Sequence, residues 1–297
     1  MNELDDLFGM MPAVATKSHP VKELPPGVYY DLPAHEYHSL PYISSTLIKR
    51  YAANTSTARE PYTPGDDANV GSGIHCWSLQ GQAGLDAECI LGPKFGKSAA
   101  DVAEKAAIIK ANPTKSILPA FYGSPAPGLP IMDVLRGVDA SLRAHPKVGP
   151  ILERSRKEVS LIWVDPDSEC KMKARLDILD GRILWDLKKC RKISGLKWEM
   201  DGGLNYRLQA ALYLDAAEAC GLDPVAFGFI ACEAFPPYEV RPFYSDPDKT
   251  ETARAEVKRL IGLIKQSVCE DYWPNFPPPP GIYDWNDLTP DDTIELI

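Results

Sequence analysis

The spacing of apolar residues predicts helices in several separate parts of the chain. The clearest helical pattern covers residues 204–220 and ends before Gly221. Residues 99–111 consist largely of strong helix formers. A serine suited to the N-cap position lies at the start of the first predicted helix, residues 43–50. The predicted helices cover residues 43–50, 70–79, 99–111, 131–144, 204–220 and 252–268.

Strand-like patterns lie between these helices. They cover residues 159–164, 170–179, 182–189 and 226–234, and the last of them is a continuous apolar run typical of a buried strand. Residues 55–67 and 119–130 are polar or rich in Gly and Pro, which predicts loops. Strands flanked by helices on both sides predict an α/β fold with a central mixed β-sheet. We expect residues 1–24 to be a flexible arm and residues 25–297 to form a single domain with a Pro-rich C-terminal tail.

Two of the predicted strands read as a β-hairpin with charged residues at positions that should face a core. Asp180-Gly181 is a two-residue turn signal. Alternation then places one set of side chains on an apolar face, namely Leu176, Ile178, Ile183, Trp185 and Leu187. The opposite face carries Lys173, Arg175, Asp177, Asp186 and Lys188.

The charged face of this hairpin suggests a metal site. In the predicted register Asp177 and Asp186 lie diagonally across the pair, close enough to share one cation that relieves their repulsion. Mg²⁺ fits because it takes hard oxygen ligands and keeps several waters. Lys188 lies on the same side and is placed to orient an attacking water and to stabilise phosphate charge. The alternative is a solvent-facing hairpin with cross-strand ion pairs.

Composition narrows the classes of protein that fit. The chain has 297 residues, 44% of them apolar, and no apolar run approaches the roughly 18 residues that span a bilayer. The acidic N-terminus lacks the basic stretch followed by an apolar stretch that marks a secretory signal, so we expect a cytoplasmic protein. Seven cysteines without a C-x-x-C pair indicate buried, reduced thiols rather than a zinc or iron–sulfur site.

The charge distribution is uneven. A net charge of −9 argues against non-specific coating of nucleic acid, yet nine basic residues and three acids lie between Lys171 and Lys197. A basic strip on an acidic body suits a polyanion held at one place. A solvated, charge-rich edge explains the strip equally well.

Four motifs in order resemble the PD-(D/E)XK nucleases. Asp177…Asp186-Leu187-Lys188 resembles the signature itself, with Leu176 where the signature has proline. The remaining motifs resemble the exonuclease VIII (RecE-type) branch, with lambda exonuclease and the RecB nuclease domain as more distant relatives. They are Gly71-Ser72-Gly73-Ile74-His75, the strand pair from Glu158 to Asp177, and the helix motif Tyr206-Arg207-Leu208-Gln209-Ala210-Ala211-Leu212-Tyr213.

This resemblance, which covers roughly residues 28–275, implies a restriction-endonuclease-like core and a set of roles. It implies Mg²⁺, with Mn²⁺ as a substitute, held by His75, Asp177, Asp186 and the carbonyl of Leu187. Lys188, Asp177, Asp186, Gln209 and Tyr206 would serve catalysis, and Lys173, Arg175, Ser44, Ser45, Lys49 and Tyr213 would contact DNA. Glu158 is a candidate for a second metal ion or a surface acid. A serine-capped helix N-terminus is a natural phosphate site, which is the reason for including Ser44, Ser45 and Lys49.

The implied activity is a Mg²⁺-dependent exodeoxyribonuclease that resects linear double-stranded DNA ends from 5′ to 3′. The resemblance also implies a single-strand annealing recombinase as partner, a ring-shaped homo-oligomer, and a bacterial or phage-encoded cytoplasmic protein. Two alternatives stay open: a structure- or sequence-specific endonuclease of the same fold, and a catalytically silent DNA-binding protein.

Overall fold

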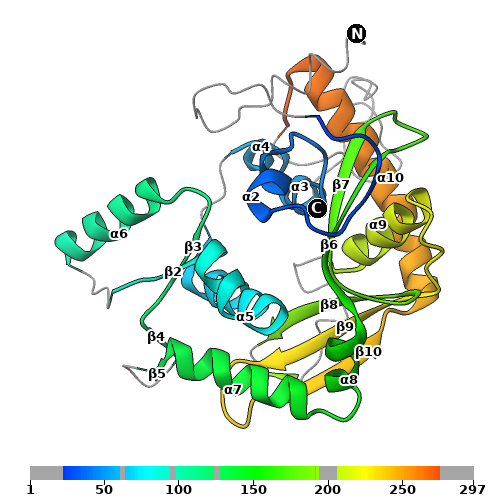
Figure 1. Cartoon of the computed structure of the whole chain (residues 1–297). Helices are drawn as coiled ribbons and strands as arrows, with labels where there is room; N and C mark the ends of the chain where they lie inside the picture. The colour runs from blue at the N-terminus through cyan, green and yellow to red at the C-terminus, as the bar shows by residue number, and fades with distance from the viewer. Residues whose placement is uncertain are drawn as a thin grey trace, which may run out of the picture.

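A six-stranded β-sheet forms the centre of the computed structural model, which describes residues 23–60, 64–93, 98–123, 128–190, 192–193 and 206–274 (Figure 1). The strands lie in the order β1 (Gly27–Tyr29), β6 (Arg156–Val164), β7 (Lys171–Asp180), β8 (Ile183–Cys190), β9 (Ala226–Glu233) and β10 (Val240–Tyr244). The β8–β9 pair is parallel and the other neighbours are antiparallel. The predicted α/β fold with a mixed sheet is confirmed.

One face of the sheet is covered by α3 (Ser45–Ala53), α9 (Tyr206–Ala219) and α10 (Pro247–Glu270), and a large apolar cluster fills the space between them (Figure 1). Ile48, Leu212 and Leu260 from the three helices pack in this cluster with strand residues such as Leu161 and Phe227. Ser44 caps α3 by accepting a hydrogen bond from Leu47 N at 3.4 Å, as the sequence predicts.

The other face is covered by α5 (Asp66–Glu88), α7 (Ile131–Ala144) and α8 (Val148–Arg154), which enclose a second apolar cluster. Ile178, Trp185 and Leu187 of the hairpin pack there against residues of α5 and α7 such as Ile74 and Leu135. Both faces of the central strands are therefore buried, which excludes the alternative of a solvent-facing hairpin.

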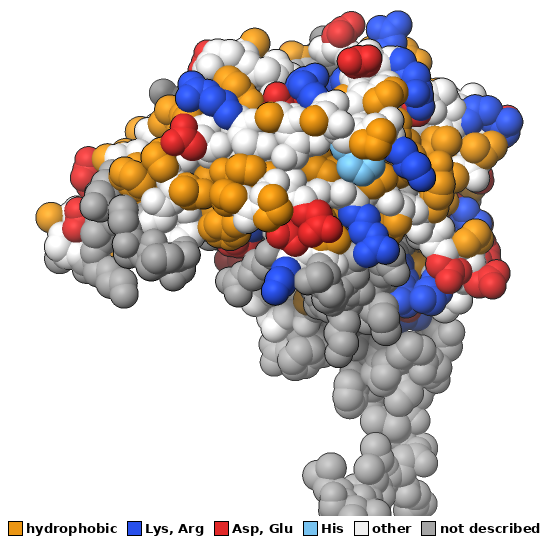
Figure 2. All heavy atoms as spheres, turned by 90° about the horizontal axis from the view of Figure 1, so that it is seen from below, with side chains coloured by type: hydrophobic (Ala, Val, Ile, Leu, Met, Phe, Trp, Pro, Cys, Tyr) orange, Lys and Arg blue, Asp and Glu red, His pale blue; other side chains and the backbone are white. Residues whose placement is uncertain are grey.

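Smaller elements complete the chain. They are α2 (Ala34–Ser39), α4 (Thr55–Ala58), β2 (Cys89–Leu91), α6 (Ala99–Ala111), β3 (Ser116–Leu118), β4 (Phe121–Tyr122) and β5 (Leu129–Pro130). Helix α6 projects from the body beyond the β2–β3 pair in Figure 1. Figure 2 views the molecule from below, and apolar side chains gather in it on the left, the side on which Figure 1 shows α6. Acidic and basic side chains are interspersed over the rest of this face.

The predicted helices and strands are observed, two of the helices with the same bounds. The strand β10 was missed because Pro242 interrupts its pattern; proline removes a ladder donor and is confined to edge strands, where β10 lies. The predicted loop over residues 55–67 contains α4 and the start of α5.

Leu24, placed in the predicted arm, packs against a small cluster with Leu32, Tyr37 and Ile162. Residues 1–22 and the Pro-rich tail from residue 275 lie outside the described residues.

The predicted hairpin register is wrong by two positions. The ladder pairs Asp180 with Ile183 and Ile178 with Trp185, so the turn consists of Gly181-Arg182, and Gly181 adopts φ 61°. A shift of two does not by itself move a side chain to the other face, since side chains alternate with a period of two. The β7–β8 ladder ends at Ile178 and Trp185, one residue before Asp177 and Asp186.

One apolar position of the hairpin also lies on the other face. Leu176 packs with α9 and α10 instead of joining Ile178 under α5. The alternation breaks because Glu158, across from Asp177 in β6, has φ 57°, a left-handed conformation that interrupts the β6–β7 pairing. This irregularity positions the candidate site described below.

Two of the expectations drawn from composition can be compared with the described structure. All seven cysteines are free thiols, but the expectation of buried thiols is met only in part: Cys190 and Cys220 are partly buried and Cys269 is exposed. No helix in the described parts of the chain is both long and apolar enough to cross a bilayer.

Close packing between β8 and β9 makes a testable prediction. Gly228 of β9 lies opposite Trp185, and a Cβ at Gly228 would sit 2.4 Å from the buried indole and 3.1 Å from the carbonyl oxygen of Phe243. We expect Gly228→Ala to lower the free energy of unfolding by about 1–3 kcal/mol in urea denaturation. Gly262→Ala in α10 is the control: a Cβ there meets nothing within 4 Å, so this variant should gain about 0.5–1 kcal/mol. Equal stabilities of the two variants would contradict the packing argument.

Candidate metal centre

Three potential metal ligands come together where α5 meets the sheet. His75 of α5 places Nε2 2.9 Å from Asp177 Oδ1 of β7 and Nδ1 3.3 Å from Glu158 Oε1 of β6. One ligand atom from each of the three residues lies within 4.8 Å of the other two. Opposite ligands of an octahedral Mg²⁺ lie about 4.2 Å apart, so small movements suffice to bind one ion.

Glu158 owes its position to the backbone irregularity in β6 and to an arginine beside it. Its left-handed φ turns the carboxylate toward α5, and Arg175 Nε donates a hydrogen bond to Oε2. Arg175 is held in turn by the carbonyl of Leu32, to which Nη1 donates at 2.9 Å. The other carboxylate oxygen, Oε1, is buried and accepts no hydrogen bond from the described residues. Its close partner among the described residues is His75 Nδ1, 3.3 Å away, so this oxygen faces a cationic imidazole at a place where a metal ion would also be stabilised.

The charges of the three residues depend on each other. Burial opposes protonation of the imidazole, but Asp177 and then Glu158 outweigh it and raise the pKa of His75 well above its ordinary value. Burial would raise the pKa of Asp177, yet His75, Lys188 and the Leu187 N–H lower it, the last by donating at 2.8 Å. Burial raises the pKa of Glu158. A divalent cation would take over the charge balance that the imidazolium provides without metal.

Asp186 and Lys188 form a second group beside the first. Burial and then the charge of Asp177 raise the pKa of Asp186 to about 6, and Asp186 Oδ2 is in contact with the ammonium of Lys188. Gln209 of α9 donates from Nε2 to Asp186 Oδ1 at 2.5 Å. We call His75, Glu158 and Asp177 the donor set. It contains Asp177 but not Asp186, and Glu158 takes the place that was predicted for Asp186. The predicted ligand role of the Leu187 carbonyl stays a prediction.

Lys49 and Tyr206 close the site from the side of α3 and α9. Lys49 Nζ donates to Gln209 Oε1 at 3.0 Å and lies 5.9 Å from the centre of the Tyr206 ring, and Lys188 Nζ lies 5.3 Å from the same ring. Burial and then repulsion by Lys188 lower the pKa of Lys49 to about 8. The sequence predicts Lys49 at the DNA end, and in the structure it lies beside Gln209 and over the same Tyr206 ring as Lys188.

Several residues predicted to contact DNA have other tasks in the structure. Lys173 is buried, and its ammonium donates to the carbonyls of Tyr37, His38 and Leu40 at the end of α2. Arg175 holds Glu158 as described. These two side chains are occupied inside the protein, which leaves neither free to bind a DNA backbone.

Residues of α3 and α9 predicted to contact DNA are also packed into the protein. Tyr213 is buried and its ring packs edge-on against Phe227, and Ser45 is also buried. Ser44 caps α3. Within the basic strip, Arg191 and Lys197 lie outside the described residues.

Sequence reasoning left the role of Glu158 open between a second metal and the surface. No spacing rule could have assigned it, because a strand residue at Glu158 would ordinarily pair with Asp177 across the ladder, and its left-handed φ is a product of the tertiary structure. His75 and Asp177, in contrast, stand where the motifs place them, and His75 is joined to both carboxylates.

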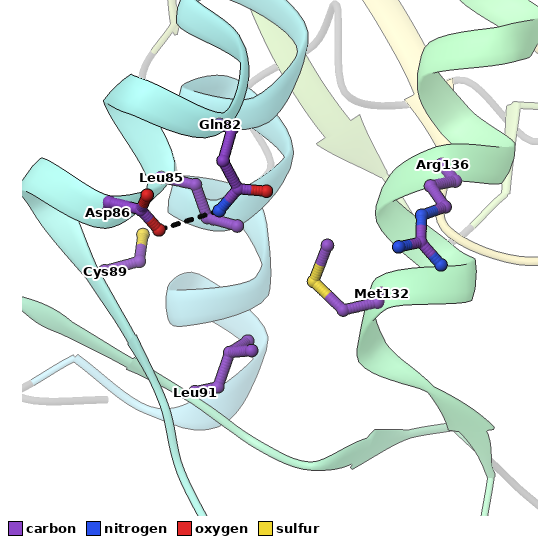
Figure 3. A pocket seen from close by; sticks show the side chains of 7 residues that line it. All are labelled: Gln82, Leu85, Asp86, Cys89, Leu91, Met132 and Arg136. Carbon is purple, nitrogen blue, oxygen red and sulfur yellow. Dashed lines mark hydrogen bonds between the residues drawn. The ribbon is translucent and has the colours of Figure 1, made fainter.

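A separate cavity of about 290 Å³ lies between α5, β2 and α7 (Figure 3). Gln82 and Asp86 of α5 face it, joined by a hydrogen bond of 2.7 Å, and Met132 and Arg136 project toward it from α7. Its lining residues are Gln82, Leu85, Asp86, Cys89, Leu91, Met132 and Arg136. None of them belongs to the donor set, so this cavity is not part of the metal centre.

Residues 50–276 match the family described as "PDDEXK-like domain of unknown function (DUF3799)". The chain belongs to this PDDEXK-like family. The match spans α5, β6, β7 and β8 and therefore includes every member of the donor set. The predicted PD-(D/E)XK-like domain and its fold are confirmed, and the family description does not specify the exonuclease VIII branch.

Two solved structures are similar to this chain. A crystal structure from Eubacterium rectale, described as a "Putative exonuclease", has a TM-score of 0.58 at 16% sequence identity, covering 83% of this chain and 90% of the other. At this identity the similarity supports the fold alone. The crystal structure of SSO0001, with a TM-score of 0.29 at 14% identity and coverage of 73% and 84%, is too different to carry an argument. No curated protein matches the sequence significantly.

The donor set predicts how metal affinity should respond to mutation. Glu158→Gln keeps the size of the side chain and the acceptor for Arg175 but removes the negative charge beside His75. We expect the affinity for Mn²⁺, measured by isothermal titration calorimetry, to fall at least about tenfold. Glu153→Gln, the same change at an exposed residue of α8, is the control and should bind Mn²⁺ like the wild type. Equal affinities of the two variants would remove Glu158 from the site.

The raised pKa of Asp186 predicts a pH dependence of stability in EDTA. Its pKa rises from 3.8 to about 6 on folding, so between these values the folded protein binds more protons than the unfolded chain. The contribution of Asp186 to the free energy of unfolding is therefore fully present below about pH 4 and is lost as the pH rises through 6. In Asp186→Asn this loss is absent. The difference in unfolding free energy, variant minus wild type, should rise by about 2–3 kcal/mol between pH 4 and pH 7 in chemical denaturation. A difference that is independent of pH would show that the Asp186 carboxyl titrates normally.

Proposed function

We propose that this protein is a metal-dependent deoxyribonuclease that hydrolyses phosphodiester bonds at the ends of double-stranded DNA. One observation carries the proposal: the His75–Glu158–Asp177 donor set lies beside the Asp186–Lys188 pair in a domain of the PDDEXK-like family. Metal ligands next to a lysine are the combination that hydrolysis of a phosphodiester requires.

The residues of the site have separable tasks under this proposal. His75, Asp177 and Glu158 would hold Mg²⁺ or Mn²⁺; a bound ion polarises the phosphate and lowers the pKa of a coordinated water. Two carboxylates suit both ions, and the imidazole favours Mn²⁺. Lys188, whose pKa is raised by Asp186 and Asp177 against the effect of burial, stays protonated and would stabilise the charge that develops on phosphorus oxygens.

Asp186 and Gln209 support this arrangement from the side of α9. Asp186 contacts the ammonium of Lys188, and Gln209 fixes the Asp186 carboxylate through its amide. The ring of Tyr206 packs on Phe229 and provides a face over which the Lys188 ammonium is held. These contacts orient the lysine, so Asp186, Gln209 and Tyr206 are positioning residues in this proposal.

The choice of DNA ends as substrate is the finer part of the proposal. It rests on the resemblance of the four motifs to exonuclease VIII and on the similar fold of the Eubacterium rectale protein, described as a "Putative exonuclease". Resection of the 5′ strand would leave a 3′ overhang for strand annealing in phage-type recombination. A ring-shaped oligomer and an annealing partner stay predictions of that resemblance.

Digestion of DNA of defined topology tests this function. With Mg²⁺ or Mn²⁺ the wild type should degrade linear duplex, labelled separately at each end, and leave covalently closed circles intact, and EDTA should stop the reaction. Cutting of closed circles would indicate an endonuclease instead. Lys188→Ala should lower the single-turnover rate about a hundredfold or more, because the loss of a charge at the transition state costs roughly 3 kcal/mol. Lys258→Ala, an exposed lysine of α10, is the matched control and should digest linear duplex at the wild-type rate. A Lys188→Ala protein that is equally fast would contradict the role given to this residue.

A further inference from the structure

The lysines around the candidate site differ in how their charges are compensated. Lys188 contacts the carboxylate of Asp186, and Lys189 lies 2.7 Å from Asp67 Oδ1. Lys173 has no carboxylate but donates to three carbonyl oxygens of α2. Each of these ammonium groups is therefore neutralised or fully hydrogen-bonded.

Lys49 has no comparable partner among the described residues. Its ammonium donates one hydrogen bond, to the neutral amide oxygen of Gln209 at 3.0 Å, and it forms no ion pair there. The side chain is nevertheless partly buried, between α3 and α9. Withdrawal of an ammonium from water is costly when neither a carboxylate nor a full set of acceptors replaces the hydration shell.

The neighbourhood of Lys49 increases this cost. Lys188 and Lys49 both lie over the ring of Tyr206, at 5.3 and 5.9 Å from its centre, so two positive charges are held near each other. The ring attracts both cations, and Asp186 and Asp177 attract Lys49 from a distance, but neither carboxylate forms an ion pair with Lys49 among the described residues. Asp186 Oδ1, the nearby carboxylate oxygen on the side of Gln209, is occupied by the Gln209 amide. An anion placed next to both ammonium groups would give Lys49 the direct ionic contact that these residues do not supply.

We propose that Lys49 is a catalytic residue that binds a non-bridging oxygen of the scissile phosphate, opposite Lys188. This inference rests on the proposed nuclease function and deepens it. The substrate phosphodiester carries the single negative charge that two ammonium groups can share. The metal ligands, placed by His75, lie on the side of α5, and Lys49 reaches the phosphate from the side of α3.

The chemistry assigned to Lys49 is electrostatic. As the water oxygen forms its bond to phosphorus and the bond to the leaving sugar oxygen breaks, negative charge grows on the non-bridging oxygens. The ammonium of Lys49 donates to one of these oxygens and keeps its own proton. The proton lost by the attacking water passes to solvent, and the leaving oxygen takes one from solvent, so the reaction adds one water across the bond.

Single-turnover cleavage of linear duplex with Mn²⁺ tests the proposal. Lys49→Ala should be about a hundredfold slower than the wild type at saturating protein, and Lys49→Arg, which keeps the charge, should recover part of the loss. Lys110→Ala, an exposed lysine on α6, is the control and should cleave at the wild-type rate. A Lys49→Ala protein within about threefold of the wild type overturns the proposal.

A sulfur substitution separates contact with the phosphate from a merely structural role. In the wild type, one phosphorothioate diastereomer at the cleaved bond should react more slowly than the other, since its sulfur replaces the oxygen that Lys49 binds. In Lys49→Ala this difference should shrink to within about threefold. An unchanged difference would mean that Lys49 acts only by holding Gln209, and the proposal would be wrong.

A binding measurement distinguishes failure of this inference from failure of the nuclease function. Thymidine 5′-monophosphate added to protein already saturated with Mn²⁺ should raise the melting temperature of the wild type and of Lys110→Ala further, and should leave that of Lys49→Ala nearly unshifted. This result supports the anion site even if the wild type cleaves no DNA, in which case the nuclease function fails alone. Equal shifts in the wild type and Lys49→Ala would overturn the site whatever the activity.

Discussion

Repulsion among buried carboxylates is the constraint around which this structure is organised. Asp177, Glu158 and Asp186 approach one another between β6, β7 and β8, where few water molecules can screen them. His75 and Lys188 compensate part of this charge, and Arg175 compensates another part at Glu158. The result is a site that is costly to fold and ready to bind a divalent cation, as expected of a functional centre.

The rest of the fold supplies the rigidity that this site needs. Two apolar clusters clamp the sheet from opposite faces, one through α3, α9 and α10 and the other through α5, α7 and α8. The helices of each cluster contribute polar residues to the site: His75 of α5 contacts Asp177, and Gln209 of α9 contacts Asp186 beside Tyr206. Because these residues stand on packed helices, their positions are set by the core, and the metal ligands need no flexible loop.

The two sides of the site are chemically different, and this asymmetry suggests a division of labour. The side of α5 holds an imidazole between two carboxylates, which suits a metal ion. The side of α3 and α9 holds two ammonium groups over an aromatic ring, which suits a phosphate. A phosphodiester lying between them would have its charge balanced from both directions, an arrangement that lowers the barrier only when both sides are rigid.

The sequence by itself determined the main helices, four strands of the mixed sheet and, through the motif resemblance, the membership of His75 and Asp177 in one site. Apolar periodicity reports burial directly, and the motifs keep their ligand types at set spacings, so these features need no knowledge of distant contacts. Only the tertiary structure decided the hairpin register, the left-handed φ of Glu158 within β6, and the partners of the Lys49, Lys173 and Arg175 side chains. A lysine looks the same in sequence whether it meets three carbonyls inside the protein, as Lys173 does, or a single amide beside the site, as Lys49 does. Which partner it finds depends on elements far apart in the chain, here α2 with β7 and α3 with α9, and no local pattern encodes that contact.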